Sequence, residues 1–154
     1  MSKLHVSCAA EGEYVIHSAA MLHSLLACHP PGTVVIHYLH GPELAERSRG
    51  KLQDMVVESG GEVKFWEIPD RWCAGLPTEG FTRTATWYRI FLPDLLPDVS
   101  RVVYFDADLI VQKAEASKVI FHSGEGNGEI GPEVKIGVPI GGVPCRVRRR
   151  YTLE

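Results

Sequence analysis

Two aspartates, Asp106 and Asp108, lie two positions apart directly after a run of apolar residues. On an extended backbone, side chains two positions apart point to the same side, so these carboxylates could share one cation. Hard oxygen ligands favour Mg²⁺ or Mn²⁺, and such an ion would neutralise phosphates and a departing diphosphate. An isolated pair of this kind is a weak signal, because many such aspartates only cap helices or form turns. Its position at the end of an apolar strand favours a metal site.

Other residue types that could support chemistry have less favourable spacing. His37 and His40 lie three apart on a predicted strand and should face opposite sides, so most of the seven histidines are interpreted as solvated or core residues. The sequence has no nucleophile elbow, phosphate-binding P-loop or dinucleotide-binding glycine motif. The four cysteines form no C-x-x-C pair, which favours a reducing compartment over a disulfide framework.

The elements that should position the aspartates alternate between strands and helices. Strands are predicted over residues 4–10, 34–39, 62–66 and 102–105, with helices beginning near Gly12 and Gly41. The predicted buried face of the first helix is Val15, Ile16, Ala19, Leu22 and Leu26, and that of the second is Leu44, Leu52, Met55 and Val56. This alternation predicts an α/β fold with a mostly parallel, Rossmann-like sheet and flanking helices.

The rest of the chain is less regular. A long loop is predicted over 67–80, a short helix over 84–92 that stops at Pro93, and an apolar extended run over 109–111. Beyond Gln112 we expect a glycine-rich loop over 123–131, one more strand over 135–143 and a basic tail over 146–150.

Ligands of open α/β sheets bind beyond the carboxyl ends of the strands. Two segments with unusual residues follow predicted strands in this way. The first is Ala9-Ala10-Glu11-Gly12-Glu13-Tyr14, and the second is Asp106-Ala107-Asp108. These segments are therefore the candidate binding site.

Three segments of the chain resemble glycosyltransferase family 8, which includes bacterial lipopolysaccharide galactosyl- and glucosyltransferases and glycogenin. The run from Arg101 to Val111 is similar to the family signature k-V-l-Y-l-D-x-D-x-l-V, and 86–93 is similar to T-Y-x-R-l-x-l-p. The segment 9–14 resembles A-A-D-x-x-Y, with Glu11 in place of the usual aspartate. Order and spacing agree over about residues 4–112.

The resemblance implies a GT-A-type nucleotide-diphospho-sugar transferase and a role for each matching residue. Asp106 and Asp108 would ligate Mn²⁺ (or Mg²⁺) on the diphosphate. Arg89 would contact the donor sugar and diphosphate, and Ala107 would touch the ribose through its backbone. The uracil and ribose pocket would be lined by Ala9, Ala10, Glu11 and Tyr14, with Tyr14 stacking on the base. Arg89, Asp106 and Asp108 are thus the predicted catalytic residues. Tyr14 could instead pack on the sheet, and Arg89 could be a surface cation.

The matching region ends before the family's site does. We find no counterpart of the family's N-x-G-V-type segment or of its histidine, glycine and lysine near the carboxyl terminus. The expectation is a nucleotide-sugar-binding α/β region over 1–112 and a divergent continuation of the same domain over 113–154. The chain would then be a fragment, a divergent or frameshifted product, or a reduced homologue.

The resemblance predicts a retaining hexosyltransferase that moves a sugar from a UDP-sugar to a hydroxyl of a saccharide or lipopolysaccharide-type acceptor. A non-catalytic nucleotide-binding module and another metal-dependent α/β nucleotidyltransferase remain as alternatives. The net charge of −3 over 154 residues argues against nucleic acid as a partner. We expect a cytoplasmic protein, because no signal peptide or membrane span is evident, and the basic tail could attract an anionic acceptor or the inner membrane face.

Overall fold

Strands and helices alternate along the first half of the chain. The computed structural model describes residues 3–78 and 83–112. The first elements are β1 (Leu4–Ala9), α1 (Tyr14–Ala27), β2 (Val34–His40), α2 (Glu46–Glu58) and β3 (Glu62–Glu67). They are followed by α3 (Asp70–Cys73), the 3-10 helix η1 (Thr84–Phe91), α4 (Leu92–Leu95) and β4 (Val103–Tyr104).

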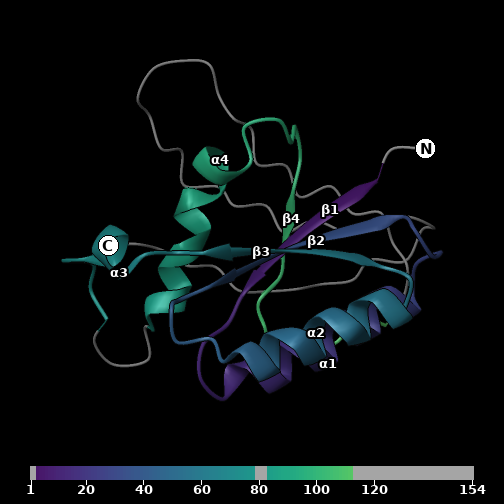
Figure 1. Cartoon of the computed structure of the whole chain (residues 1–154). Coiled ribbons are helices and arrows are strands. Elements are labelled where there is room, and N and C mark those ends of the chain that lie inside the picture. Colours follow the sequence, from purple (N-terminus) through teal and green to yellow (C-terminus); the bar gives the residue numbers. More distant parts are fainter. Residues whose placement is uncertain (1–2, 79–82, 113–154) are drawn as a thin grey trace.

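The strands form one sheet in the order β3-β2-β1-β4, and every neighbouring pair is parallel. Pairing of Leu4 with Val34 sets the β1–β2 register, and pairing of Val6 with Val103 sets the β1–β4 register. The predicted α/β fold with a mostly parallel sheet is therefore confirmed for the described residues. The last strand lies beside the first, so segments distant in sequence leave the same edge of the sheet (Figure 1).

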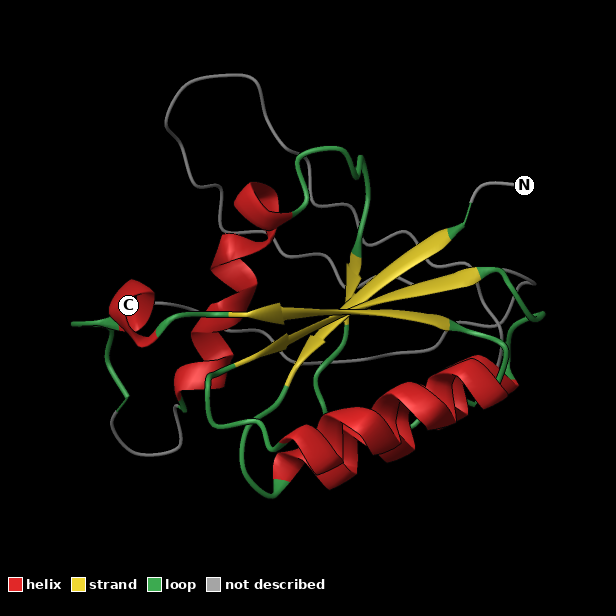
Figure 2. Ribbon diagram, in the orientation of Figure 1, coloured by secondary structure: helices red, strands yellow, loops and turns green. Residues whose placement is uncertain are grey.

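Helices cover both faces of this sheet. Figure 1 shows α1 and α2 side by side along one face, and Figure 2 shows the twisted strands fanning out above them. A core of buried side chains from both layers, including Val6, Ile36, Tyr38 and Leu22, fills the space between the sheet and these helices. On the other face, η1 and α4 pack near the carboxyl ends of the strands through a second core that includes Leu39, Tyr88 and Leu92.

The buried face of α1 differs from the predicted one. The fully buried residues are Ser18, Met21, Leu22, Leu25 and Leu26, with the spacing of one helical face. Ile16, predicted to be buried, is 76% exposed. The observed face buries the large apolar side chains of Met21 and Leu25, which the predicted stripe left out. Ser18 lies in the same face, where its hydroxyl lies 2.8 Å from the Tyr38 hydroxyl and donates to the Val15 carbonyl.

Three other boundaries also need correction. The second helix begins at Glu46, not at Gly41, although Leu44 still packs on the same core as Leu52 and Val56. The predicted loop over 67–80 contains α3. Pro93 does not end a helix but lies in the first turn of α4, where the missing amide hydrogen costs little.

The segment after β4 is held against α1 without forming a strand. The Val111 amide donates to the Ser24 hydroxyl at 2.9 Å, and the Cys28 thiol lies 3.7 Å from the Val111 carbonyl. The predicted extended run at 109–111 therefore forms no ladder, because its hydrogen bond goes to a side chain of α1.

Cys8, Cys28 and Cys73 are free thiols. Within residues 3–78 and 83–112, no helix has the length and apolar character needed to cross a membrane. The predicted loop at 123–131, the strand at 135–143, the basic tail and Cys145 all lie outside the described residues.

Candidate functional site

The two predicted site segments leave adjacent strands at one edge of the sheet. Ser7 of β1 pairs with Tyr104 of β4, and the Phe105 amide donates to the Ser7 carbonyl at 2.8 Å. Because the strands are parallel, the segments that follow them, 9–14 and 106–108, run out in the same direction. The fold thus brings together two segments separated by most of the described chain.

The aspartate pair adopts a different backbone from the predicted one. β4 ends at Tyr104, and Ala107 and Asp108 form a turn. Ala107 is buried in the same core as Ala10, whereas Asp106 is partly exposed and Asp108 exposed. Because Ala107 and Asp108 lie in a turn, strand alternation does not govern where Asp108 points. Both carboxylates nevertheless stay outside the core.

Asp106 and Asp108 are the two carboxylates that the sequence predicted as metal ligands. Across the described ranges, no three His, Cys, Asp or Glu side chains are grouped so that they could hold an ion. Two carboxylates can still suit Mg²⁺ or Mn²⁺, because such ions often combine one or two protein carboxylates with waters and substrate phosphates. The donor chemistry therefore fits a hard divalent cation that is shared with a phosphorylated ligand.

Arg89, on η1, is fixed directly beside Asp106. Its Nη2 lies 3.3 Å from Asp106 Oδ1, and its Nε donates to the Thr86 carbonyl at 2.9 Å. The guanidinium carbon lies 4.4 Å from the centre of the Tyr104 ring, a cation–π geometry. Burial holds the pKa of the Tyr104 phenol above its usual value, so this ring stays neutral. Arg89 is thus held beside Asp106 by contacts with Thr86 and Tyr104.

Glu11 links the segment after β1 to the start of η1. Burial raises the pKa of its carboxyl group, and the nearby Glu43 charge acts in the same direction. Hydrogen bonding from the backbone of Ala85 and Thr84, and the charge of Arg83, oppose that rise in pKa. Backbone amides at the start of a helix favour a carboxylate, so Glu11 helps to hold η1 against β1.

The other residues of the first segment have mixed surroundings. Ala9 and Ala10 are buried, at 7% and 2% exposure, so only their backbone could line a pocket. Tyr14 is partly buried, packs on the core between α1 and the sheet, and meets the His17 ring edge-on. The Arg83 guanidinium lies 5.2 Å from the centre of its ring.

The sequence did not point to three further side chains at this edge, namely Glu43, Arg83 and Tyr88. A Cβ at Gly41 would lie 2.7 Å from both the Tyr88 hydroxyl and a Glu43 carboxylate oxygen. A glycine at the end of β2 therefore lets these groups approach the backbone. Burial, and then the charge of Glu43, raise the pKa of the Tyr88 phenol. The Gly41-Pro42 pair was the available signal for this close approach.

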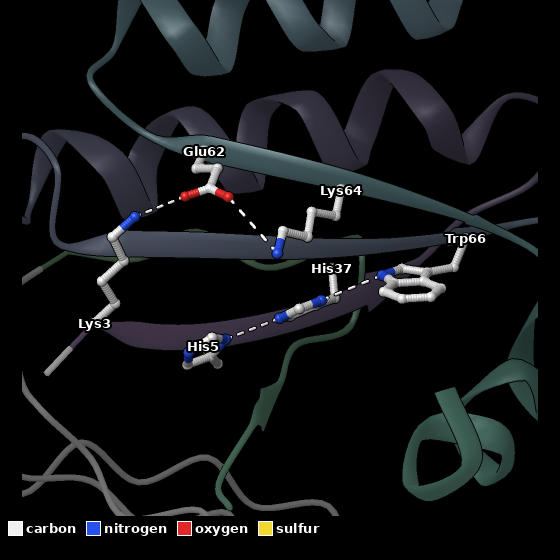
Figure 3. Close-up of polar contacts among 6 residues, drawn as sticks. All are labelled: Lys3, His5, His37, Glu62, Lys64 and Trp66. Carbon is white, nitrogen blue, oxygen red and sulfur yellow. Dashed lines mark hydrogen bonds and ion pairs between the residues drawn. The ribbon is translucent and has the colours of Figure 1, made fainter. Parts of the chain in front are cut away.

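A separate row of hydrogen-bonded side chains crosses the face of the sheet that carries η1 (Figure 3). Trp66 Nε1 donates to His37 Nδ1 at 3.2 Å, and His37 Nε2 lies 2.9 Å from His5 Nδ1. An indole nitrogen can only donate, so His37 Nδ1 is the acceptor and the proton of the neutral ring lies on Nε2. The second bond therefore runs from His37 to His5.

His40 packs against Phe65 on the opposite face, as the strand spacing predicted. The charged groups around the histidine pair are Lys3, Glu62 and Lys64.

The row of hydrogen bonds through Trp66, His37 and His5 should make the free energy of unfolding fall with decreasing pH. Burial, then the charges of His5 and Lys64, lower the pKa of His37 from 6.5 to about 4, and burial also lowers the pKa of His5. Unfolded histidines bind protons near pH 6.5, whereas the folded pair resists protonation. The free energy of unfolding should therefore drop between pH 6.5 and 4, by about 2–3 kcal/mol.

Urea denaturation of the full chain at several pH values measures this slope. His37→Gln should flatten it, since the amide can accept from Trp66 and donate to His5 without titrating. His23→Gln, at an exposed position of α1, is the matched control and should keep the slope. An unchanged slope in His37→Gln would contradict the assignment.

Comparison with known proteins identifies a family over most of the chain and one curated relative. Residues 5–118 match the family model described as Glycosyl transferase family 8. General stress protein A of Bacillus subtilis (strain 168) is 24% identical over 110 residues, which cover 70% of this chain and 38% of that protein.

Solved structures show the same fold. The galactosyltransferase LgtC, crystallised with donor and acceptor sugar analogs, superposes with a TM-score of 0.65 at 23% identity, covering 72% of this chain and 40% of that chain. The glycosyltransferase GlyE of Streptococcus pneumoniae TIGR4 gives a TM-score of 0.55 at 22% identity, covering 74% and 26%. The fold is thus of the GT-A type. The present chain spans about 40% of the length of both General stress protein A and LgtC.

Proposed function

Because this chain belongs to glycosyl transferase family 8, we propose that residues 3–112 bind the UDP-sugar donor of a retaining hexosyltransferase. The observation that carries this proposal is the meeting of the two site segments at one sheet edge. There, Arg89 is paired with Asp106 at 3.3 Å, just after β4. Tyr14 is the first residue of α1, which follows the neighbouring strand β1. A cation and an aromatic ring at the carboxyl ends of neighbouring strands suit a phosphate and a base.

Each residue takes a role that fits its surroundings. Asp106 and Asp108 hold Mn²⁺ or Mg²⁺, and Arg89 binds the diphosphate and the sugar. Tyr14 stacks on uracil, beside a pocket formed by the backbone of Ala9 and Ala10 and by Glu11. The backbone of Ala107 touches the ribose. The acceptor is a saccharide or lipopolysaccharide-type hydroxyl, a class consistent with the sugar analogs bound to LgtC.

The chemistry divides between the bound ion and the chain. A divalent cation, when bound, neutralises charge on the departing diphosphate. Arg89 adds a second positive group at the same place and orients phosphate oxygens through its fork of donors. No side chain at this edge is assigned as a nucleophile, in keeping with same-face attack by the acceptor and retention at the sugar carbon.

A second candidate is a nucleotide-binding module without transfer activity. It is favoured by one observation: within the described residues, no third metal-ligating side chain joins Asp106 and Asp108. An ion held by so few protein ligands leaves the sugar open to water, where hydrolysis competes with transfer.

Calorimetric titration of the full chain with UDP, with and without Mn²⁺, tests both candidates. We expect UDP to bind more tightly with Mn²⁺, by about tenfold or more, because the ion bridges carboxylates and phosphates. A donor-hydrolysis assay then separates the enzyme from the module, which would bind without turnover. Absence of binding to both UDP and Mn²⁺ would refute both, and tighter binding of CTP or ATP would indicate a nucleotidyltransferase.

A further inference from the structure

A small ion-paired cluster covers the aromatic ring of Tyr14. The Arg83 guanidinium carbon lies 5.2 Å from the ring centre, and its Nη2 lies 3.6 Å from Glu13 Oε1. Glu13 and Tyr14 begin α1, whereas Arg83 immediately precedes η1. Arg83 therefore connects the segment after β1 to the start of η1, directly over the ring.

The present separation leaves no room for a base on this side of the ring. A base stacked between two flat groups needs roughly 3.5 Å on each side, about 7 Å in all, more than the 5.2 Å observed. A base that stacks on this face of Tyr14 must therefore displace the guanidinium outward. Among the described residues, Arg83 is the only cation recorded over this ring.

The contacts that hold Arg83 are weak enough to be exchanged. Its side chain is 52% exposed and that of Glu13 is 76% exposed, so the ion pair is screened by solvent and contributes little to stability. A guanidinium also stacks on nucleobases as readily as on aromatic side chains. Arg83 can thus leave the Tyr14 ring and cover the outer face of a base instead.

We propose that Arg83 is a nucleobase-binding residue: it covers Tyr14 in the free protein and stacks on the outer face of the base when a nucleoside diphosphate binds. The base then lies between Tyr14 and Arg83. This inference rests on the proposed function, which brings the nucleotide to Tyr14. The proposal adds a contact between the base and Arg83, at the start of η1. Arg89 lies on the same helix, so one helix would contact both the base and the diphosphate.

The test uses two probes that differ only in whether they carry a nucleoside. Full-length wild type, Arg83→Ala and Arg83→Lys are titrated with UDP and with inorganic pyrophosphate, both with Mn²⁺. We expect both variants to lose about 5- to 20-fold in affinity for UDP, because neither replaces the flat stacking group. Pyrophosphate affinity should stay unchanged. Arg47→Ala, at an exposed position of α2, is the matched control for loss of a positive charge.

Several results would overturn the assignment of Arg83. Wild-type or tighter UDP binding by Arg83→Ala would show that Arg83 only obstructs the ring. Recovery in Arg83→Lys, or an equal loss for pyrophosphate, would show that its charge acts on the phosphates. If wild type itself fails to bind UDP with Mn²⁺, the proposed function fails. Wild-type binding with an unaffected variant refutes the role of Arg83 alone.

Discussion

Replacing Asp108 with alanine is expected to abolish the Mn²⁺ dependence of UDP binding. Asp108 is exposed in the turn after β4, so its loss should not disturb the core. Asp106 is already paired with Arg89, and it alone would offer a divalent ion one carboxylate. We expect UDP affinity in the presence of Mn²⁺ to fall on the order of 100-fold, roughly 2.7 kcal/mol.

Calorimetry with UDP, with and without Mn²⁺, measures this effect, and thermal unfolding verifies that the variant is folded. Asp98→Ala is the matched control, because Asp98 is also an exposed aspartate in a turn near β4. It should bind UDP and Mn²⁺ as wild type does. If Asp108→Ala keeps its Mn²⁺ dependence, the metal site is not at this aspartate pair.

Replacing Arg89 with methionine is expected to weaken UDP binding but strengthen the binding of Mn²⁺ alone. In the free protein the guanidinium neutralises Asp106, so a metal ion must compete with it for this carboxylate. Without Arg89 the carboxylate is unpaired, and Mn²⁺ should bind a few-fold more tightly. The diphosphate loses a charge-assisted partner worth about 1.5–3 kcal/mol, so UDP affinity should fall about 10- to 100-fold.

Two titrations separate these opposite effects. Mn²⁺ binding without nucleotide can be followed by electron paramagnetic resonance, and UDP binding at saturating Mn²⁺ by calorimetry. Arg47→Met provides the control for loss of an exposed arginine on α2. Arg89→Lys should fall between wild type and Arg89→Met, because it keeps a charge but loses the flat face over Tyr104. Unchanged Mn²⁺ affinity in Arg89→Met would show that the ion pair with Asp106 does not compete with the metal.

The different surroundings of Asp106 and Asp108 explain why different effects are expected from these two variants. Asp106 forms an ion pair with Arg89, whereas Asp108 forms no ion pair with any of the described residues. The carboxylate of Asp106 is therefore held by Arg89, whereas that of Asp108 is exposed to solvent. A ligand that carries both a metal and a diphosphate can satisfy Asp106 and Arg89 at once by separating them.

The sequence by itself determined the order of strands and helices and the edge at which the site should lie. Apolar periodicity and glycine or proline breaks are local signals, and they were sufficient to locate β1, β2, β3 and the strand before Asp106. Parallel strands place their carboxyl ends together, so the meeting of the segments at 9–14 and 106–108 also followed from the strand assignments.

The directions of two side chains depend on packing and do not follow from local sequence patterns. Ile16 fits an apolar helical stripe, but α1 packs on the sheet through Met21, Leu22, Leu25 and Leu26, so Ile16 faces solvent. Asp108 fits strand alternation, but it lies in a turn with Ala107, which is buried in the core. In both cases the direction of a side chain differs from the one that local periodicity predicts.

Only the tertiary structure decided what surrounds the site. Where η1 packs against β1 and β2 depends on the path of loops whose sequences carry no periodic signal. That position places Arg89 on Asp106, 17 residues away, and Arg83 on Tyr14. Such contacts join parts of the chain that share no helix or strand, so residue spacing cannot encode them and three-dimensional packing must.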